Sequence, residues 1–180
     1  TKNHVIYGNL AAIYSNKGNK KEVIKLLNTA IKLEPNFPEG YANLGIIFKQ
    51  NGDFKGAINY LKKAIILQPK NTEYYYNLAC CQKAEGDLKY AIKSFQKAID
   101  LNPSDSNSLC DLGSCYNAQG DYDLAIYSYK QAIKFNSNLY EAYHNLGISL
   151  IATGKINKAI ESLKKAIKLN PKFYLSYYIL

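Results

Sequence analysis

The chain has 180 residues, a formal net charge of +9 and a hydrophobic content of 47%, which is enough to bury a core and excludes global disorder. No apolar run approaches the length of a transmembrane helix. All 23 basic side chains are lysine, and because arginine makes the bidentate contacts to guanine and phosphate, its absence disfavours nucleic acid as a partner.

One pattern of 34 residues recurs along the whole chain. A leucine recurs at this spacing, at Leu10, Leu44, Leu78, Leu112, Leu146 and Leu180. A glycine recurs in the same way, at Gly18, Gly52, Gly86, Gly120 and Gly154. The sequence therefore predicts a single array over residues 1–180, made of repeats 4–37, 38–71, 72–105, 106–139 and 140–173 and the start of a sixth at 174–180.

Each repeat is predicted to form two helices joined by a short turn. In repeat 38–71 the first helix starts at Pro38, which suits a first helical turn, and runs to about Asn51. Gly52 can adopt the left-handed conformation that ends a helix, and Asp53 can cap the next one, which runs to about Leu67. The Gly-Asp pair recurs at 86–87 and 120–121, with milder or incomplete versions at 18–19 and 154–155.

A proline follows most of the second helices and ends them. Ser137 replaces this proline in the fourth repeat, and we expect a looser junction there.

The order of side chains in each repeat resembles the tetratricopeptide repeat. In the first helix of repeat 38–71 the pattern is a large residue, leucine, a small residue and a large residue, at Tyr41, Leu44, Gly45 and Phe48. In the second helix it is alanine, a large residue, alanine and a closing proline, at Ala57, Leu61, Ala64 and Pro69. Gln82 and Val23 depart from the pattern, but all five repeats keep its register. The resemblance implies an all-α fold, a right-handed α-solenoid of stacked helix-turn-helix repeats. It also implies a concave groove, lined by the first helices, where partners bind.

The position before the repeated leucine holds an amide or a carboxylate in every repeat: Asn9, Asn43, Asn77, Asp111 and Asn145. An asparagine amide donates and accepts, so one per repeat can hold a peptide backbone. The pattern is similar to the asparagine ladder in the repeat array of O-linked N-acetylglucosamine transferase. Asp111 departs from it, since a carboxylate has no donor. The alternative is that these side chains are simply solvated.

Other side chains are predicted to share this groove face. Tyr76 is a candidate binding hot spot, Ala42 and Ile46 lie on the same face of the first helix, and the charged candidates are Glu39, Glu73, Glu141, Lys49 and Lys83. The carboxylate clamp of chaperone-tail-binding relatives is not matched in any register, so we expect no capture of an acidic chaperone tail. The remaining lysines cluster on the outer face of the second helices. We expect a solvated surface there, with a basic surface that binds acidic proteins, RNA or lipid headgroups as the alternative.

The sequence contains no signature of catalysis. A phosphate loop, a nucleophile elbow and an H-E-x-x-H motif are all missing. Cys81 and Cys115 are predicted to be buried. Cys80 and Cys110 are predicted to face the groove, and Cys110 shares its repeat position with His144, which leaves a disulfide, a metal site or a Cys-His nucleophile as weak alternatives. We expect no enzyme activity, no cofactor and no metal.

The sequence thus predicts a non-catalytic scaffold that binds an extended peptide or a partner helix. Two alternatives remain open: a substrate-recruiting arm of a larger enzyme such as a glycosyltransferase, and a structural module that self-associates or uses its basic outer face. Residues 174–180 and Val5-Ile6-Tyr7 are apolar, so self-association through the ends is part of the second alternative. We interpret the chain as a fragment of a longer protein, and the unpatterned cysteines favour an intracellular, cytoplasmic setting.

Overall fold

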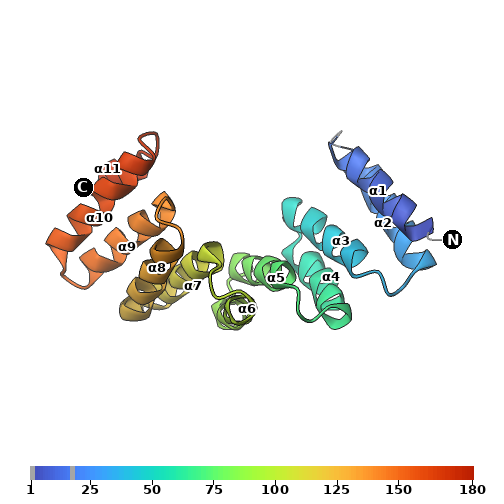
Figure 1. Cartoon of the computed structure of the whole chain (residues 1–180), viewed down its shortest axis with the longest axis horizontal. Coiled ribbons are helices and arrows are strands. Elements are labelled where there is room, and N and C mark those ends of the chain that lie inside the picture. Colours follow the sequence, from blue (N-terminus) through green and yellow to red (C-terminus); the bar gives the residue numbers. More distant parts are fainter. Residues whose placement is uncertain (1–2, 17–18) are drawn as a thin grey trace. The chain divides into compact units, whose positions relative to one another are not determined.

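A computed structural model describes residues 3–16 and 19–180 of the chain, which form eleven helices and no strand. The chain divides into two compact units, unit 1 (Thr1–Asp87) and unit 2 (Leu88–Leu180) (Figure 1). Unit 1 contains α1 (Asn3–Asn16), α2 (Lys20–Leu33), α3 (Pro38–Gln50), α4 (Phe54–Leu67) and α5 (Thr72–Ala84). Unit 2 contains α6 (Leu88–Leu101), α7 (Ser106–Gln119), α8 (Tyr122–Phe135), α9 (Tyr140–Ala152), α10 (Ile156–Leu169) and α11 (Leu175–Ile179).

The turns between paired helices largely follow the predicted chemistry. Gly52 and Gly120 have φ values of 80° and 85°, the left-handed region in which a side chain would be strained. The Asp53 carboxylate accepts a hydrogen bond from the Gly56 amide at 2.8 Å and so caps α4. Asp121 stands at the same position before α8 but makes no such bond, so its predicted capping role is wrong. Gly18 lies outside the described residues.

Close contact between paired helices depends on small residues opposite large ones. In unit 1, Ala57, Leu61 and Ala64 of α4 are completely buried. A Cβ atom placed on Gly45 of α3 would lie 2.7 Å from the Leu61 Cγ atom, so the glycine is what lets α3 approach α4.

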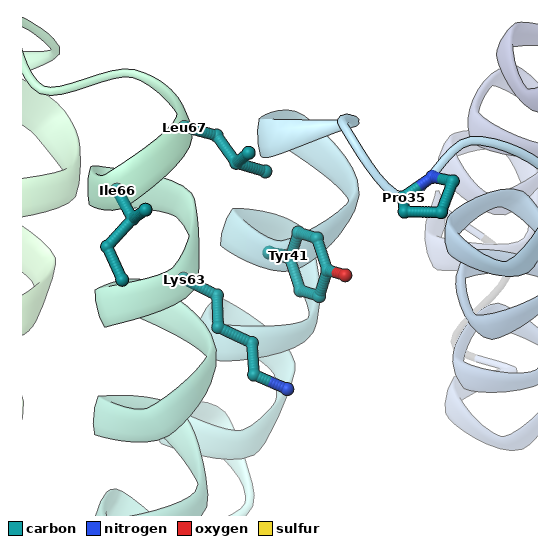
Figure 2. Close-up of a pocket in the computed structure, with 5 residues that line it drawn as sticks. All are labelled: Pro35, Tyr41, Lys63, Ile66 and Leu67. Atoms are coloured by element: carbon teal, nitrogen blue, oxygen red, sulfur yellow. The ribbon is translucent and has the colours of Figure 1, made fainter.

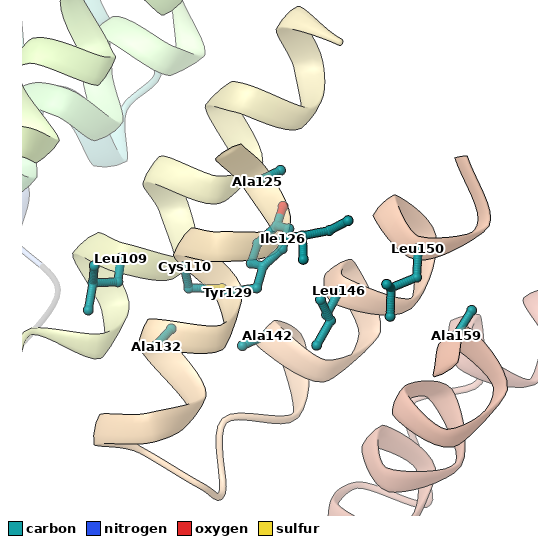
Figure 3. Close-up of a cluster of buried hydrophobic side chains, with 10 residues drawn as sticks. All are labelled: Leu109, Cys110, Ala125, Ile126, Tyr129, Ala132, Ala142, Leu146, Leu150 and Ala159. Atoms are coloured by element: carbon teal, nitrogen blue, oxygen red, sulfur yellow. The ribbon is translucent and has the colours of Figure 1, made fainter. Parts of the chain in front are cut away.

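Unit 2 repeats this packing with Gly113 of α7 against the ring of Tyr129, which is 1% exposed. Figure 3 shows Tyr129 in a cluster of buried side chains from α7, α8, α9 and α10. These helices therefore share one continuous core.

The junction at Ser137 has the same turn as its neighbours. The Asn136 side-chain oxygen accepts a hydrogen bond from the Asn138 amide at 3.1 Å. Asn102 and Asn170 make the equivalent bond, at 3.3 and 3.2 Å, in the junctions immediately before and after it, both of which contain proline. The expected looser junction is therefore not observed, because an asparagine side chain holds the turn without the proline ring.

The first and last helices expose apolar side chains. Ile6 of α1 is 63% exposed, and Tyr178 of α11 is 86% exposed. No helix in the described parts of the chain is both long and apolar enough to cross a bilayer.

Candidate functional site

Within each unit, first helices of consecutive repeats touch, α3 with α5 in unit 1 and α7 with α9 in unit 2. Packing between helices buries several side chains at one repeat position that was predicted to face the groove. Ala42 is 3% exposed and packs in one cluster with Tyr74 of α5. Cys110 and His144 occupy the same repeat position in unit 2, and are 8% and 7% exposed. Helix-to-helix packing covers each of them, so the prediction that Cys110 and its repeat equivalent His144 face the groove is wrong, whereas a small part of Ala42 still reaches the pocket described next.

An open polar pocket of about 210 Å³ lies between α3 and α5 in unit 1. Glu39, Asn43 and Glu73 border it and are all exposed. Its other lining residues are Ala42, Ile46, Gln68, Asn71 and Tyr74. The structure thus brings together five residues that were predicted to share the groove face, four from α3 and one from the start of α5.

Tyr74 forms a wall of this pocket from the core side. Its side chain is 5% exposed. Burial, and then the nearby negative charges of Glu39 and Glu73, raise the pKa of the Tyr74 hydroxyl to about 12. Both carboxylates therefore act on the same phenol, which stays neutral and able to donate a hydrogen bond at physiological pH.

Asn77, the third predicted rung, is buried at 6% exposure. Its amide nitrogen donates to the Glu73 carbonyl at 3.0 Å, and its amide oxygen accepts from the Lys49 ammonium at 2.5 Å. Lys49 and Asn77 were both predicted as groove residues, and the structure pairs them with each other. Both ends of this amide are occupied within the protein itself.

The predicted residues of unit 2 lie on α7 and α9 and are half-buried: Asp111, Glu141 and Asn145. Hydrogen bonding to Glu141, together with burial, raises the pKa of the adjacent Tyr140 hydroxyl. The Ser149 hydroxyl donates to the Asn117 side-chain oxygen at 2.8 Å. The sequence analysis missed this pair, although Asn117 stands 68 residues after Lys49, at the same repeat position.

The other predicted groove residues are accessible to different degrees. Asn9 is exposed on α1, whereas Tyr76 and Lys83 are half-buried on α5. Gln68, Asn71 and Tyr74 line the pocket but were not predicted to do so. The repeat length could have predicted their position. Adjacent first helices are 34 residues apart, so residues about 30 positions after Glu39 lie next to Glu39 at the start of the following repeat.

The four cysteines of the described residues form no disulfide. Burial raises the pKa of Cys81 to about 11, which keeps it protonated and a poor nucleophile. The His144 ring nitrogen Nδ1 is hydrogen-bonded to the Ser176 hydroxyl at 2.9 Å. No group of three or more metal-ligating side chains occurs among residues 3–16 and 19–180.

A second pocket, of about 150 Å³, opens beside α4 in unit 1 (Figure 2). Pro35, Tyr41, Lys63, Ile66 and Leu67 line it. The Lys63 ammonium lies 5.7 Å from the centre of the Tyr41 ring. The ammonium of this outer-face lysine is therefore within cation–π distance of the tyrosine ring.

Comparison with known proteins identifies the repeat. Family models for the tetratricopeptide repeat match residues 38–71, 72–105 and 140–173, and others with the same description match 4–37 and 94–127. A model described as a TPR repeat matches 113–154. No curated protein matches the chain.

Several solved structures share the fold. A crystal structure of MamA is 28% identical, with a TM-score of 0.85, over 90% of this chain and 95% of that one. YrrB, described as a TPR protein with an unusual peptide-binding site, is 22% identical, with a TM-score of 0.83, over 96% of this chain and 89% of that one. MamA from Desulfovibrio magneticus RS-1 is 19% identical, with a TM-score of 0.87, over 94% and 96%. These similarities confirm the predicted all-α solenoid.

Proposed function

Because the chain belongs to the tetratricopeptide repeat family, we propose that it is a non-catalytic scaffold that binds an extended peptide or a partner helix along its first helices. Membership of the family supports a general protein-binding role. The observation that carries the finer proposal is the pocket between α3 and α5, where Glu39, Asn43 and Glu73 border one open space.

Asn43 is the rung best placed to hold a peptide backbone. Its side chain is exposed and makes no hydrogen bond within the described residues, so its amide can donate to a peptide carbonyl and accept from a peptide N–H. Asn77 differs, because a ligand would first have to displace Lys49. The asparagines at this repeat position are therefore not equally available to a peptide, and Asn43 contributes most to peptide binding in unit 1.

The neighbouring side chains suit a peptide that also carries side chains. Ile46 is half-buried and lines the same pocket, which provides apolar contact beside the polar rim. A site with a few polar groups around an apolar floor fixes the orientation of a ligand as well as holding it.

The test is a selection of peptides from a displayed random library, followed by affinity measurements on variants. We expect Asn43→Ala to weaken binding of the selected peptides by about fivefold to tenfold, the effect of losing one or two ligand hydrogen bonds. Asn59→Ala is the matched control, because Asn59 is an exposed asparagine on α4 of the same repeat. Equal affinities for both variants would refute the assignment to the first helices.

A further inference from the structure

We propose that the pocket between α3 and α5 is a subsite for a cationic side chain, the ammonium of a lysine or the guanidinium of an arginine in the bound peptide. This inference rests on the proposed function, since it names the chemistry of one residue of that peptide.

The first observation is that the two carboxylates of the pocket are not neutralised by the protein. Glu39 and Glu73 come from different helices, and neither forms an ion pair in the described part of the chain. The nearest lysine in sequence, Lys70, is exposed and pairs with neither of them. The negative charge at the rim is therefore available to a ligand.

The second observation is the hydroxyl of Tyr74. The side chain is 5% exposed, and its hydroxyl has no hydrogen-bond partner among the described residues. Since no fully buried side-chain oxygen or nitrogen in those residues lacks a partner, this hydroxyl keeps some exposure to solvent. We place it at the pocket wall, because Tyr74 lines the pocket and the charges of both Glu39 and Glu73 act on the hydroxyl. It supplies a third oxygen that can accept a hydrogen bond from a cation.

The rest of the lining fits the stem of a long basic side chain. Half-buried Ile46 and the small exposed part of Ala42 supply apolar contact for the methylene groups of lysine or arginine. The side-chain oxygens of Asn43 and Gln68 add neutral acceptors. Two carboxylates are few for a hard divalent cation, which takes six or more oxygen ligands. An organic cation with an apolar stem matches the lining better.

The protein already holds one ammonium group between the same two helices, through a neutral amide oxygen. Lys49 of α3 reaches across to α5 and donates to the Asn77 side-chain oxygen at 2.5 Å. The pocket lies between the same two helices but has no lysine of its own. A ligand cation would thus bridge α3 and α5 near Glu39, at the start of α3, as Lys49 bridges them near the end of α3.

The net charge of +9 does not prevent this binding. Surface charges farther apart than the Debye length, about 8 Å at physiological ionic strength, are largely screened. The contacts inside the pocket are direct and act at short range. A basic ligand would associate slowly but would be held by the local carboxylates.

The test uses n-butylguanidinium chloride as the probe, with sodium butyrate and n-pentanol as the anionic and neutral controls. Amide shifts in two-dimensional NMR report the binding site. We expect saturable shifts within residues 39–46 and 68–74 for butylguanidinium alone. The double variant Glu39→Gln/Glu73→Gln should bind it about fivefold to tenfold more weakly, as expected for the loss of two partly screened ion pairs.

Glu161→Gln is the matched control, because Glu161 is an exposed carboxylate on α10, a second helix, and forms no ion pair in the described residues. It should leave binding at the pocket unchanged. A dissociation constant of the double variant equal to that of the wild type, or no shift of these amides in the wild-type protein, would overturn the subsite.

The two proposals fail separately. If butylguanidinium binds the pocket while Asn43→Ala and Asn59→Ala bind selected peptides equally, the peptide assignment is wrong and the cation site stands. The second case starts from selected peptides that do bind at Asn43, in which lysine or arginine is then replaced by alanine. If this replacement lowers the affinity equally for the wild-type protein and for Glu39→Gln/Glu73→Gln, the subsite is wrong.

Discussion

Replacing Asn77 with alanine should destabilise unit 1, whereas the same replacement at Asn43, one repeat earlier, should not. Asn77 is 6% exposed and both ends of its amide are hydrogen-bonded. Asn43 is exposed and makes no such bonds. The two residues share a repeat position, so the comparison isolates the effect of their surroundings.

The magnitude follows from the two bonds. The bond from the Asn77 amide to the Glu73 carbonyl is neutral and is worth about 1 kcal/mol. The bond from Lys49 is charge-assisted, but Lys49 is half-buried and regains water when the bond is lost, so we count about 1 kcal/mol for it as well. Asn77→Ala should thus cost about 2 kcal/mol, and Asn43→Ala should stay within about 0.5 kcal/mol of the wild type.

Urea unfolding, followed by the helical circular dichroism signal, measures both effects. Lys49→Met is a useful third variant, because it removes one of the two bonds and should cost about half as much as Asn77→Ala. The reasoning would be refuted if Asn77→Ala and Asn43→Ala had equal free energies of unfolding, since the bonds described for Asn77 would then contribute nothing.

Three further predictions concern packing, turn geometry and pH. Leu61→Ala should lower the free energy of unfolding by about 2–5 kcal/mol, because Leu61 is completely buried, while Ile66→Ala on the same helix, where the side chain is 77% exposed, should change it by less than about 0.5 kcal/mol in the same urea titration. Gly120→Ala should cost about 1 kcal/mol in thermal unfolding through backbone strain alone, because φ is 85° and the space around a new Cβ atom is empty; an unchanged melting temperature would contradict this. Burial lowers the pKa of His144 below its ordinary value of 6.5, so the unfolded or undocked state binds the proton more readily. The docking of α11 through Ser176 should therefore be strongest above pH 6.5 and weaken as the pH falls below it, and hydrogen exchange of the α11 amides should lose this pH dependence in His144→Gln.

The repeat, its helices and its core were predictable from periodicity. Leu61 recurs as a large side chain between two alanines, and the structure buries it completely. The predicted stop at Gly52 and start at Asp53 agree with the end of α3 at Gln50 and the start of α4 at Phe54. These features are local, because they depend on residues within one repeat.

The accessibility of the candidate groove residues was predicted less well, because it depends on contacts between repeats. A helical wheel places Ala42, Cys110 and His144 on the side away from the second helix, but it cannot show that the next repeat covers them. The bond between Lys49 and Asn77 joins residues 28 positions apart, and such a contact has no signature in the sequence. The pairing decides whether an asparagine is available to a ligand, so the equivalence of the five rungs could not be judged beforehand.

The turn at Asn136 has a consequence for how such a chain can change during evolution. Its side-chain bond to the Asn138 amide keeps the path that neighbouring junctions share, although Ser137 has replaced the proline. Two independent features, the side-chain hydrogen bond of an asparagine and the ring of a proline, therefore stabilise the same turn. A substitution that removes one of them is buffered by the other, so junction sequences can diverge while neighbouring repeats stay in register.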